Sequence, residues 1–249
     1  PPRSTLFPYT TLFRSGEAHQ IALSLQGANI DFIVSMAGVT RKPVERTYLT
    51  RKGGFGGVDG LAEYLGKREI KGLIDATHPF AAIISKSAFL AAQKTDVPLI
   101  RYARPEWDVS TIAGCQTAPN LVEAARDLPA GARAFLTVGG NSLAPFIHRS
   151  NVWFLFRGVE PMETPFSQGE ALVQRPPFTL KAEITLMKNH AITHLVTKNA
   201  GGVQTRAKID AANELDISVI MVERPVLPVV EKASTVLDVL RWAQRLQSM

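Results

Sequence analysis

The stretch LIDATHPFA, residues 73–81, joins a short apolar strand to a helix through a polar turn. Pro79 falls near the first helical position, where its fixed φ and missing N–H are tolerated, and Thr77 or His78 would cap the helix. The same junction presents the His78 imidazole beside a helix N-terminus, within reach of an anionic ligand or a reacting centre. Both interpretations place a helix directly after a buried strand.

The rest of the chain repeats this alternation, which is typical of βαβ units and a parallel sheet. We expect strands at residues 31–36, 44–50, 72–76 and 98–102, with helices at 17–26, 58–68, 80–94 and 118–127. A break at residues 128–131, LPAG, precedes strands at 134–138, 153–157, 194–197 and 218–222, a proline-rich stretch at 161–177, and helices at 180–189, 204–215 and 235–246. The sequence therefore predicts an α/β protein with two Rossmann-like parallel-sheet domains, residues 16–128 and 129–249, facing a central cleft.

Residues 1–15, PPRSTLFPYTTLFRS, follow neither a helical nor a strand period and lack the features of a signal peptide. Residues 5–15 resemble a translated sequencing adapter, so we interpret residues 1–15 as a foreign lead-in. A strand is expected before Glu17, and on this interpretation the first strand of the N-terminal domain is lost.

Composition narrows the class of protein. The 249 residues are 45% hydrophobic and 20% charged, which excludes a disordered or collagen-like chain. Cys115 is a single cysteine, so an internal disulfide is impossible and a reducing compartment, the cytoplasm, is expected. No apolar run approaches the ~20 residues of a membrane span. The net charge of +6 favours an anionic partner, but the basic residues are dispersed, so we predict no nucleic-acid partner.

Two glycine-rich loops are candidate ligand sites. Residues 53–57, GGFGG, match neither a dinucleotide fingerprint nor a P-loop and are equally compatible with a merely flexible loop. Residues 197–202, TKNAGG, combine a lysine, two glycines and a following helix, so they predict an anion cradle unless the glycines only make a turn. His190 and His194 lack a third ligand, so we predict no metal site. No activated nucleophile is evident in the sequence. Hydride transfer would need a bound cofactor, because no side chain supplies a hydride.

Four motifs, in this order and spacing, resemble precorrin-6A reductases and their cobalt-precorrin-6A counterparts: GGFGG at 53–57, DATHPFA at 75–81, RPEW at 104–107 and KNAGG at 198–202. The resemblance covers residues 16–249. It implies two Rossmann-like domains, NADPH as the hydride donor, and reduction of a ring double bond in a tetrapyrrole that carries many carboxylates. The product would be precorrin-6B, in cobalamin biosynthesis.

The resemblance also assigns candidate site residues. His78 would position the substrate or donate a proton. Cofactor contacts would come from Gly16, Glu17, Ser35, Thr40, Arg41, Lys198, Asn199, Gly201, Gly202 and Thr205. Substrate contacts would come from Arg51, Gly53, Gly54, Gly56, Gly57, Thr77, Pro79, Phe80, Arg101, Arg104 and Trp107.

This chain departs from the family pattern at three places. Val39 replaces an arginine, and Arg41 or Lys42 could take over its anion contact, while the absence of an acid there favours NADPH. Ala200 replaces a usual serine. Residues 13–15, FRS, stand where the family has Gly-Gly-Thr, so we expect the chain as given to be destabilised or inactive. A binding module without turnover, or another NADP-dependent oxidoreductase, stays as the alternative.

Overall fold

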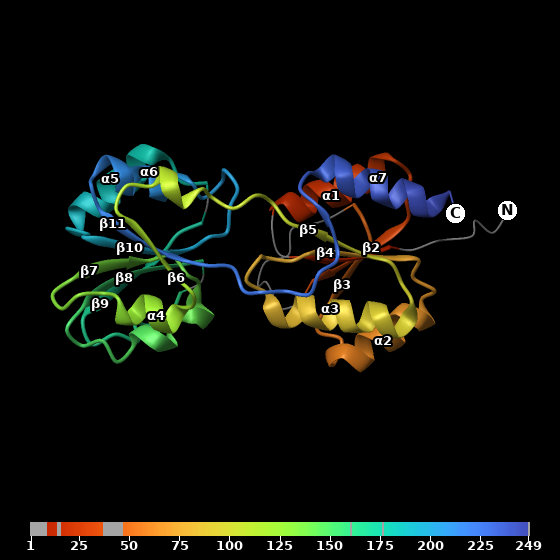
Figure 1. Ribbon diagram of the computed structural model, residues 1–249, viewed down its shortest axis with the longest axis horizontal. Helices are drawn as coiled ribbons and strands as arrows, with labels where there is room; N and C mark the ends of the chain where they lie inside the picture. The colour runs from red at the N-terminus through yellow and green to blue at the C-terminus, as the bar shows by residue number, and fades with distance from the viewer. Residues whose placement is uncertain (1–8, 14–15, 37–46, 160, 176, 249) are drawn as a thin grey trace. The chain divides into compact units, whose positions relative to one another are not determined.

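The computed structural model describes residues 9–13, 16–36, 47–159, 161–175 and 177–248. The chain divides into two compact units (Figure 1). Unit 1 comprises residues 1–104 and 226–249, and unit 2 comprises residues 105–225. Each unit is an α/β structure built on its own six-stranded sheet, in which every described strand pair is parallel.

The sheet of unit 1 has the strand order of a doubly wound fold. Its strands are β1 (Tyr9–Phe13), β2 (Phe32–Met36), β3 (Thr50–Lys52), β4 (Gly72–Ala76), β5 (Leu99–Tyr102) and β12 (Glu231–Ala233). They lie in the order β12-β5-β4-β1-β2-β3, so the chain runs outward from β1 in one direction and from β4 in the other. Ligands of such sheets bind at the carboxyl ends of the strands where this order reverses, which in unit 1 is between β1 and β4.

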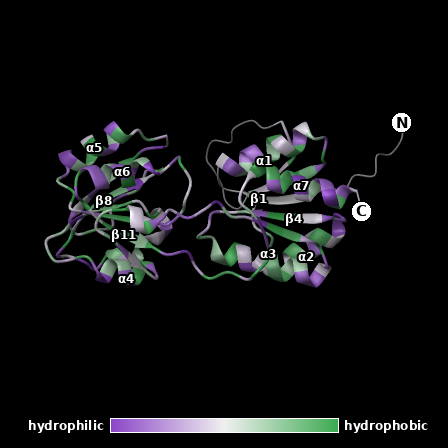
Figure 2. Ribbon diagram, turned by 45° about the horizontal axis from the view of Figure 1, so that its top comes forward, coloured by the Kyte–Doolittle hydropathy of each residue, from purple (hydrophilic) through white to green (hydrophobic). Residues whose placement is uncertain are grey.

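Helices cover both faces of this sheet (Figure 1). The helices α1 (Gly16–Gly27) and α7 (Val236–Gln247) lie on one face, and α2 (Gly57–Lys67) and α3 (Ala82–Thr95) lie on the other. Both faces are therefore apolar, and all five residues of β4 are buried. Figure 2 shows the helices striped with hydrophobic and hydrophilic residues, as expected when one side of a helix packs on a sheet.

The sheet of unit 2 also reverses its order once. Its strands are β6 (Cys115–Ala118), β7 (Arg133–Leu136), β8 (Trp153–Gly158), β9 (Gly169–Val173), β10 (His194–Lys198) and β11 (Ser218–Val222), in the order β6-β11-β10-β7-β8-β9. The helices α5 (Leu180–Asn189) and α6 (Ala207–Glu214) pack together, and α4 (Leu121–Arg126) contacts β6 and β11. The order reverses between β7 and β10, so the carboxyl ends of these two strands form the second candidate crevice.

The predicted domain boundary after residue 128 is wrong. Strand β6 pairs with β11, so residues 105–128 belong to unit 2. The C-terminal segment returns to unit 1, where β12 pairs with β5 and α7 packs against α1. These assignments depend on pairing between strands that are about a hundred residues apart, which no local pattern in the sequence records.

The structure also corrects several predicted elements. Residues 9–13 form β1, which pairs with β2 and β4 in the central place where we expected a lost strand. Backbone N–H and C=O groups make these pairs, so a segment without strand periodicity can still supply them. Strands β6, β9 and β12 were not predicted, and the helix expected at 118–127 begins only at Leu121 because Asn120 caps it. Within the described part of the chain, no helix is long and apolar enough to span a membrane.

Candidate functional site

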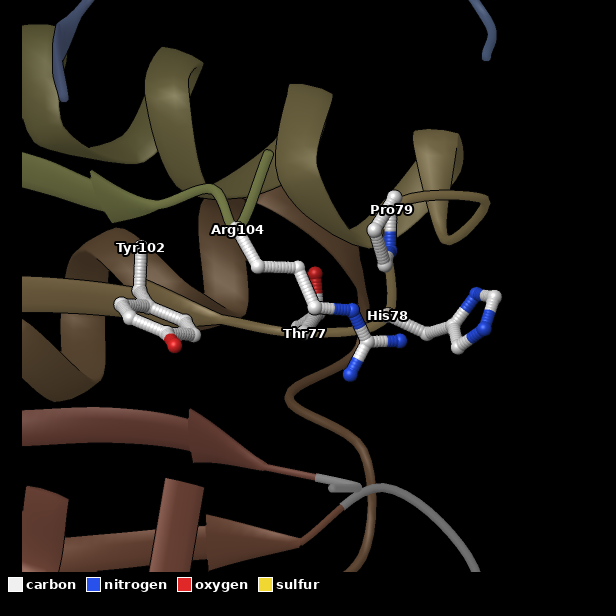
Figure 3. Close-up of a pocket in the computed structure, with 5 residues that line it drawn as sticks. All are labelled: Thr77, His78, Pro79, Tyr102 and Arg104. Atoms are coloured by element: carbon white, nitrogen blue, oxygen red, sulfur yellow. The ribbon is translucent and has the colours of Figure 1, made fainter. Parts of the chain in front are cut away.

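A pocket lies at the carboxyl ends of β4 and β5 in unit 1, beside the point where the strand order reverses (Figure 3). Its lining residues are Thr77, His78, Pro79, Tyr102 and Arg104. Four of these five residues were predicted as site residues, and the structure brings them together from two neighbouring strands. Tyr102 was not predicted, although it ends a predicted strand two residues before Arg104, a spacing that places alternate residues of an extended chain on one side.

Asp75 organises the turn that carries His78. Its Oδ1 accepts hydrogen bonds from the Thr77 backbone N–H (3.2 Å) and hydroxyl (2.7 Å), and the carboxylate is only 1% exposed. The predicted cap at Thr77 or His78 is wrong, because α3 begins at Ala82 and has no side-chain cap. Instead, His78 Nδ1 accepts the Phe80 N–H at 3.2 Å, which leaves Nε2 as the second ring nitrogen at the pocket. The turn therefore fixes the imidazole before the helix starts.

Arg101 is bound by groups of the protein itself. Its Nε donates to Asp75 Oδ2 at 3.0 Å and its Nη1 donates to the carbonyl of Pro228 at 3.0 Å, and the residue is 6% exposed. Arg101 was predicted to bind a substrate carboxylate, and in the structure its guanidinium is buried with a carboxylate of the protein itself. The pair joins β4, β5 and the segment that precedes β12.

Arg104 is held at the pocket by Glu17. The Arg104 Nη1 lies 2.5 Å from Glu17 Oε1, and both side chains are 16% exposed. Glu17 was predicted as a cofactor contact, but in the structure its carboxylate, from the first turn of α1, binds this guanidinium. Burial, followed by the negative charge of Glu17, raises the pKa of Tyr102, so its hydroxyl stays protonated at neutral pH.

The glycine loop of residues 53–57 is closed by Arg51. The Arg51 guanidinium donates to the carbonyls of Gly53 and Gly54, each at 2.7 Å, and to the Ser35 hydroxyl at 3.3 Å, and it lies 3.9 Å from the centre of the Phe55 ring. Gly56 precedes α2 with φ 82°, a conformation that favours glycine. Arg51 thus shapes the loop. Thr40 and Arg41, predicted to contact the cofactor, lie outside the described residues.

Lys198 lies at the second candidate crevice, where β10 ends. Its Nζ donates to the Ser142 hydroxyl at 2.7 Å, and Ser142 belongs to the loop that follows β7. Burial lowers the pKa of Lys198. The neighbouring Thr197 is fully buried, and its hydroxyl has no hydrogen-bond partner among the described residues. The loop then turns through Gly201 and Gly202, which have φ values of 67° and 79°.

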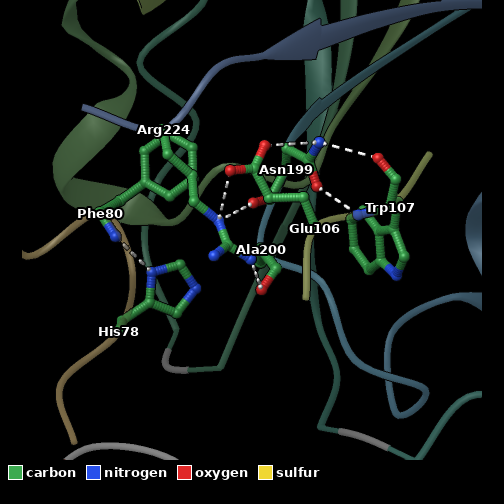
Figure 4. Close-up of polar contacts among 7 residues, drawn as sticks. All are labelled: His78, Phe80, Glu106, Trp107, Asn199, Ala200 and Arg224. Carbon is green, nitrogen blue, oxygen red and sulfur yellow. Dashed lines mark hydrogen bonds and ion pairs between the residues drawn. The ribbon is translucent and has the colours of Figure 1, made fainter. Parts of the chain in front are cut away.

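Asn199 and Trp107, both predicted to contact ligands, bind each other inside unit 2 (Figure 4). The Asn199 side chain accepts the Trp107 N–H at 2.9 Å and donates to its carbonyl at 3.1 Å, and the indole N–H donates to the Gly202 carbonyl at 2.9 Å. Both side chains are nearly buried. They shape the loop after β10, and neither polar group can reach a ligand without breaking these bonds.

Arg224 secures the same loop and was not predicted from the sequence. Its guanidinium donates to the carbonyls of Asn199 (2.9 Å) and Ala200 (3.2 Å) and lies 3.8 Å from Glu106 (Figure 4). A Cβ atom at Gly201 would overlap the carbonyl oxygen of Pro105, so only glycine fits there. Thr205 follows in the turn before α6. The sequence does not indicate this role of Arg224, because its acceptors are backbone carbonyls, which every residue has.

Cys115, His190 and His194 were the remaining side chains considered for catalysis or metal binding. Burial raises the pKa of the Cys115 thiol and lowers the pKa of His194, which argues against an activated thiolate and a charged imidazole. His190 Nε2 lies 3.4 Å from Glu170. Among the described residues, no group of three histidine, cysteine or acidic side chains could hold a metal ion.

Comparison with known proteins agrees with the motifs. The model of the family "Precorrin-6x reductase CbiJ/CobK" matches residues 15–244. Precorrin-6A reductase from Rhodococcus erythropolis is 39% identical over 232 residues, which cover 92% of this chain and 94% of that protein. Precorrin-6A reductase from Rhodobacter capsulatus is 38% identical over 229 residues, 91% of each chain. A solved structure titled "CobK precorrin-6A reductase" superposes with a TM-score of 0.90 at 36% identity and covers 96% of each chain.

Proposed function

This chain belongs to the precorrin-6x reductase CbiJ/CobK family, and from that premise we propose that it reduces a ring double bond of precorrin-6A to give precorrin-6B, with NADPH as the reductant. The observation that carries the proposal is the pocket of His78, Tyr102 and Arg104 beside the switch point of unit 1, in a chain 39% identical to a precorrin-6A reductase over nine tenths of its length. A binding module without turnover is the less favoured alternative.

Unit 1 fits a dinucleotide. Its strand order is the one in which a dinucleotide lies across the carboxyl ends of the strands, with the pyrophosphate at the start of the first helix, here Gly16. The ribose end would then approach Ser35 at the end of β2, and the nicotinamide end would approach the pocket after β4 and β5. NADPH, when bound, supplies a hydride. Lys198, Gly202 and Thr205 in unit 2 are proposed as further anion contacts.

The side chains of the pocket would position the substrate and donate a proton to the reduced ring. Arg104, oriented by Glu17, would bind a carboxylate of the tetrapyrrole, because a fixed guanidinium matches the geometry of a carboxylate. Thr77 and Pro79 shape the wall of the pocket. His78, held by the Phe80 N–H, would position the substrate or give a proton to the reduced ring. Tyr102 keeps its proton and is a second candidate donor.

The test is a direct assay of the chain. NADPH absorbance is followed with and without precorrin-6A, and NADH is tried in parallel. We expect oxidation that depends on precorrin-6A and prefers NADPH, at a rate lowered by residues 13–15, which replace the family's Gly-Gly-Thr, and a strong further loss in His78→Ala. Folded protein that binds NADPH but never oxidises it with either precorrin-6A or its cobalt form would contradict the proposal and favour a binding module.

A further inference from the structure

The contact between Lys198 and Ser142 joins the two loops at the switch point of the sheet in unit 2. Lys198 is the last residue of β10, and Ser142 ends a short 3₁₀ turn, Gly140–Ser142, that follows β7. Strands β7 and β10 are neighbours, and the strand order reverses between them. Two groups that are 56 residues apart in sequence therefore meet where open α/β sheets bind their ligands.

The turn that carries Ser142 is held by its own backbone. The Ser142 N–H donates to the Gly139 carbonyl at 3.0 Å, and Gly139 has a φ of 88°, which closes the turn. Lys198 has a flexible four-carbon side chain, so an acceptor at 2.7 Å from Nζ restricts the positions that the ammonium can occupy. A hydroxyl is neutral, and it orients the ammonium without cancelling its positive charge.

The surroundings of Lys198 suit an anion. The following loop turns through two glycines with positive φ, and the backbone N–H groups of Gly202, Val203 and Gln204 donate to no acceptor among the described residues. Arg224 holds the carbonyls of Asn199 and Ala200 and so keeps the loop in this form.

We propose that Ser142 is a positioning residue: its hydroxyl accepts a hydrogen bond from Lys198 Nζ and holds this ammonium at the switch point of unit 2, where it binds an anionic group of a reactant. The inference rests on the proposed function, which supplies two sources of that anion. One is a carboxylate of the tetrapyrrole, and the other is a phosphate of the cofactor. Both offer negatively charged oxygen atoms, and the experiment distinguishes them.

Three variants of the whole chain test the proposal. Ser142→Ala removes the acceptor, Ser142→Thr keeps a hydroxyl, and Ser150→Ala is the matched control because Ser150 is exposed in a turn of the same unit. For each variant, kcat and the KM values for NADPH and precorrin-6A are measured, together with the melting temperature. Calorimetric titration with NADPH and with precorrin-6A measures binding without turnover, so a failure of the proposed reaction leaves the role of Ser142 testable.

We expect Ser142→Ala to raise one KM and the matching dissociation constant about tenfold, the size expected for losing a hydrogen bond to a charged group, with little change in kcat. Ser142→Thr should recover most of this loss, and Ser150→Ala should change nothing. An effect on precorrin-6A identifies a carboxylate, and an effect on NADPH identifies a phosphate. Unchanged affinities in Ser142→Ala would overturn the proposal, and so would a loss of affinity that only follows a lower melting temperature.

Discussion

The two sheets hold the cations at their carboxyl ends in different ways. In unit 1, Arg101 and Arg104 pair with carboxylates from other elements, Asp75 and Glu17. In unit 2, Lys198 donates to the neutral hydroxyl of Ser142. The Arg101–Asp75 pair is buried and joins strands of the sheet, whereas the Arg104–Glu17 pair is partly exposed and Arg104 lines the pocket. The Ser142 hydroxyl orients the Lys198 ammonium without neutralising it. The comparison teaches that a basic residue near a strand end serves the fold or the ligand according to what it pairs with and how deeply it lies.

The largest effect is expected from breaking the buried pair of unit 1. Asp75→Ala leaves the Arg101 guanidinium buried without its carboxylate and removes the oxygen that accepts both the backbone N–H and the hydroxyl of Thr77, so we expect a loss of about 3–5 kcal/mol in the free energy of unfolding. Urea unfolding measures it. Asp59→Ala breaks the exposed pair with Lys94 and serves as the control, for which no measurable change is expected. Equal stabilities of the two variants would contradict the structural role given to Asp75.

In unit 2 the loop is held by close packing, and Gly201→Ala tests this. The added Cβ would overlap the Pro105 carbonyl, and the backbone φ of 67° is unfavourable for alanine, so we expect a loss of about 1–3 kcal/mol in the free energy of unfolding. Gly66→Ala, inside α2 with open space around it, should be neutral or slightly stabilising. Thermal unfolding of both variants compares them, and a stable Gly201→Ala would show that the loop can move away.

Glu17→Gln separates ligand binding from folding in unit 1. The Glu17–Arg104 pair is partly exposed, so stability should change little, while a less well oriented guanidinium should raise the KM for precorrin-6A roughly tenfold. Steady-state kinetics for both substrates measure this. Glu123→Gln, which breaks an exposed pair with Arg126, is the control. A rise in the KM for NADPH alone would instead identify Glu17 as a cofactor contact.

The smallest effect is a pH dependence that belongs to Lys198. Burial lowers its pKa below the ordinary value of 10.5, so in the alkaline range the folded protein binds fewer protons there than the unfolded chain does. Between the lowered pKa and 10.5 this group makes folding more favourable as pH rises, and over the same rise the ammonium that we propose as an anion contact loses its charge. KM for the anionic reactant should therefore increase at high pH. Lys198→Arg keeps its charge throughout, and the increase should disappear in that variant.

The candidate site was only partly predictable from the sequence. The motif around His78 identified the turn after β4, because a polar junction between strand and helix is a local feature. Asp75, Tyr102 and Arg224 were not assigned roles, since their partners lie on distant segments. Arg101 was predicted to be a ligand contact, and the residues around it in sequence do not show that Asp75 and the carbonyl of Pro228 bind it.

The sequence by itself determined that the chain is a parallel α/β protein, because the apolar periods of strands and helices repeat within a few residues. It also determined the family, through four short motifs. Tertiary structure alone decided that β12 and α7 return to unit 1, that β6 joins β11, and which protein groups bind Arg101, Arg104 and Lys198. Strand pairing and burial depend on groups that meet only after folding, so their outcome is not recorded in any local stretch of residues.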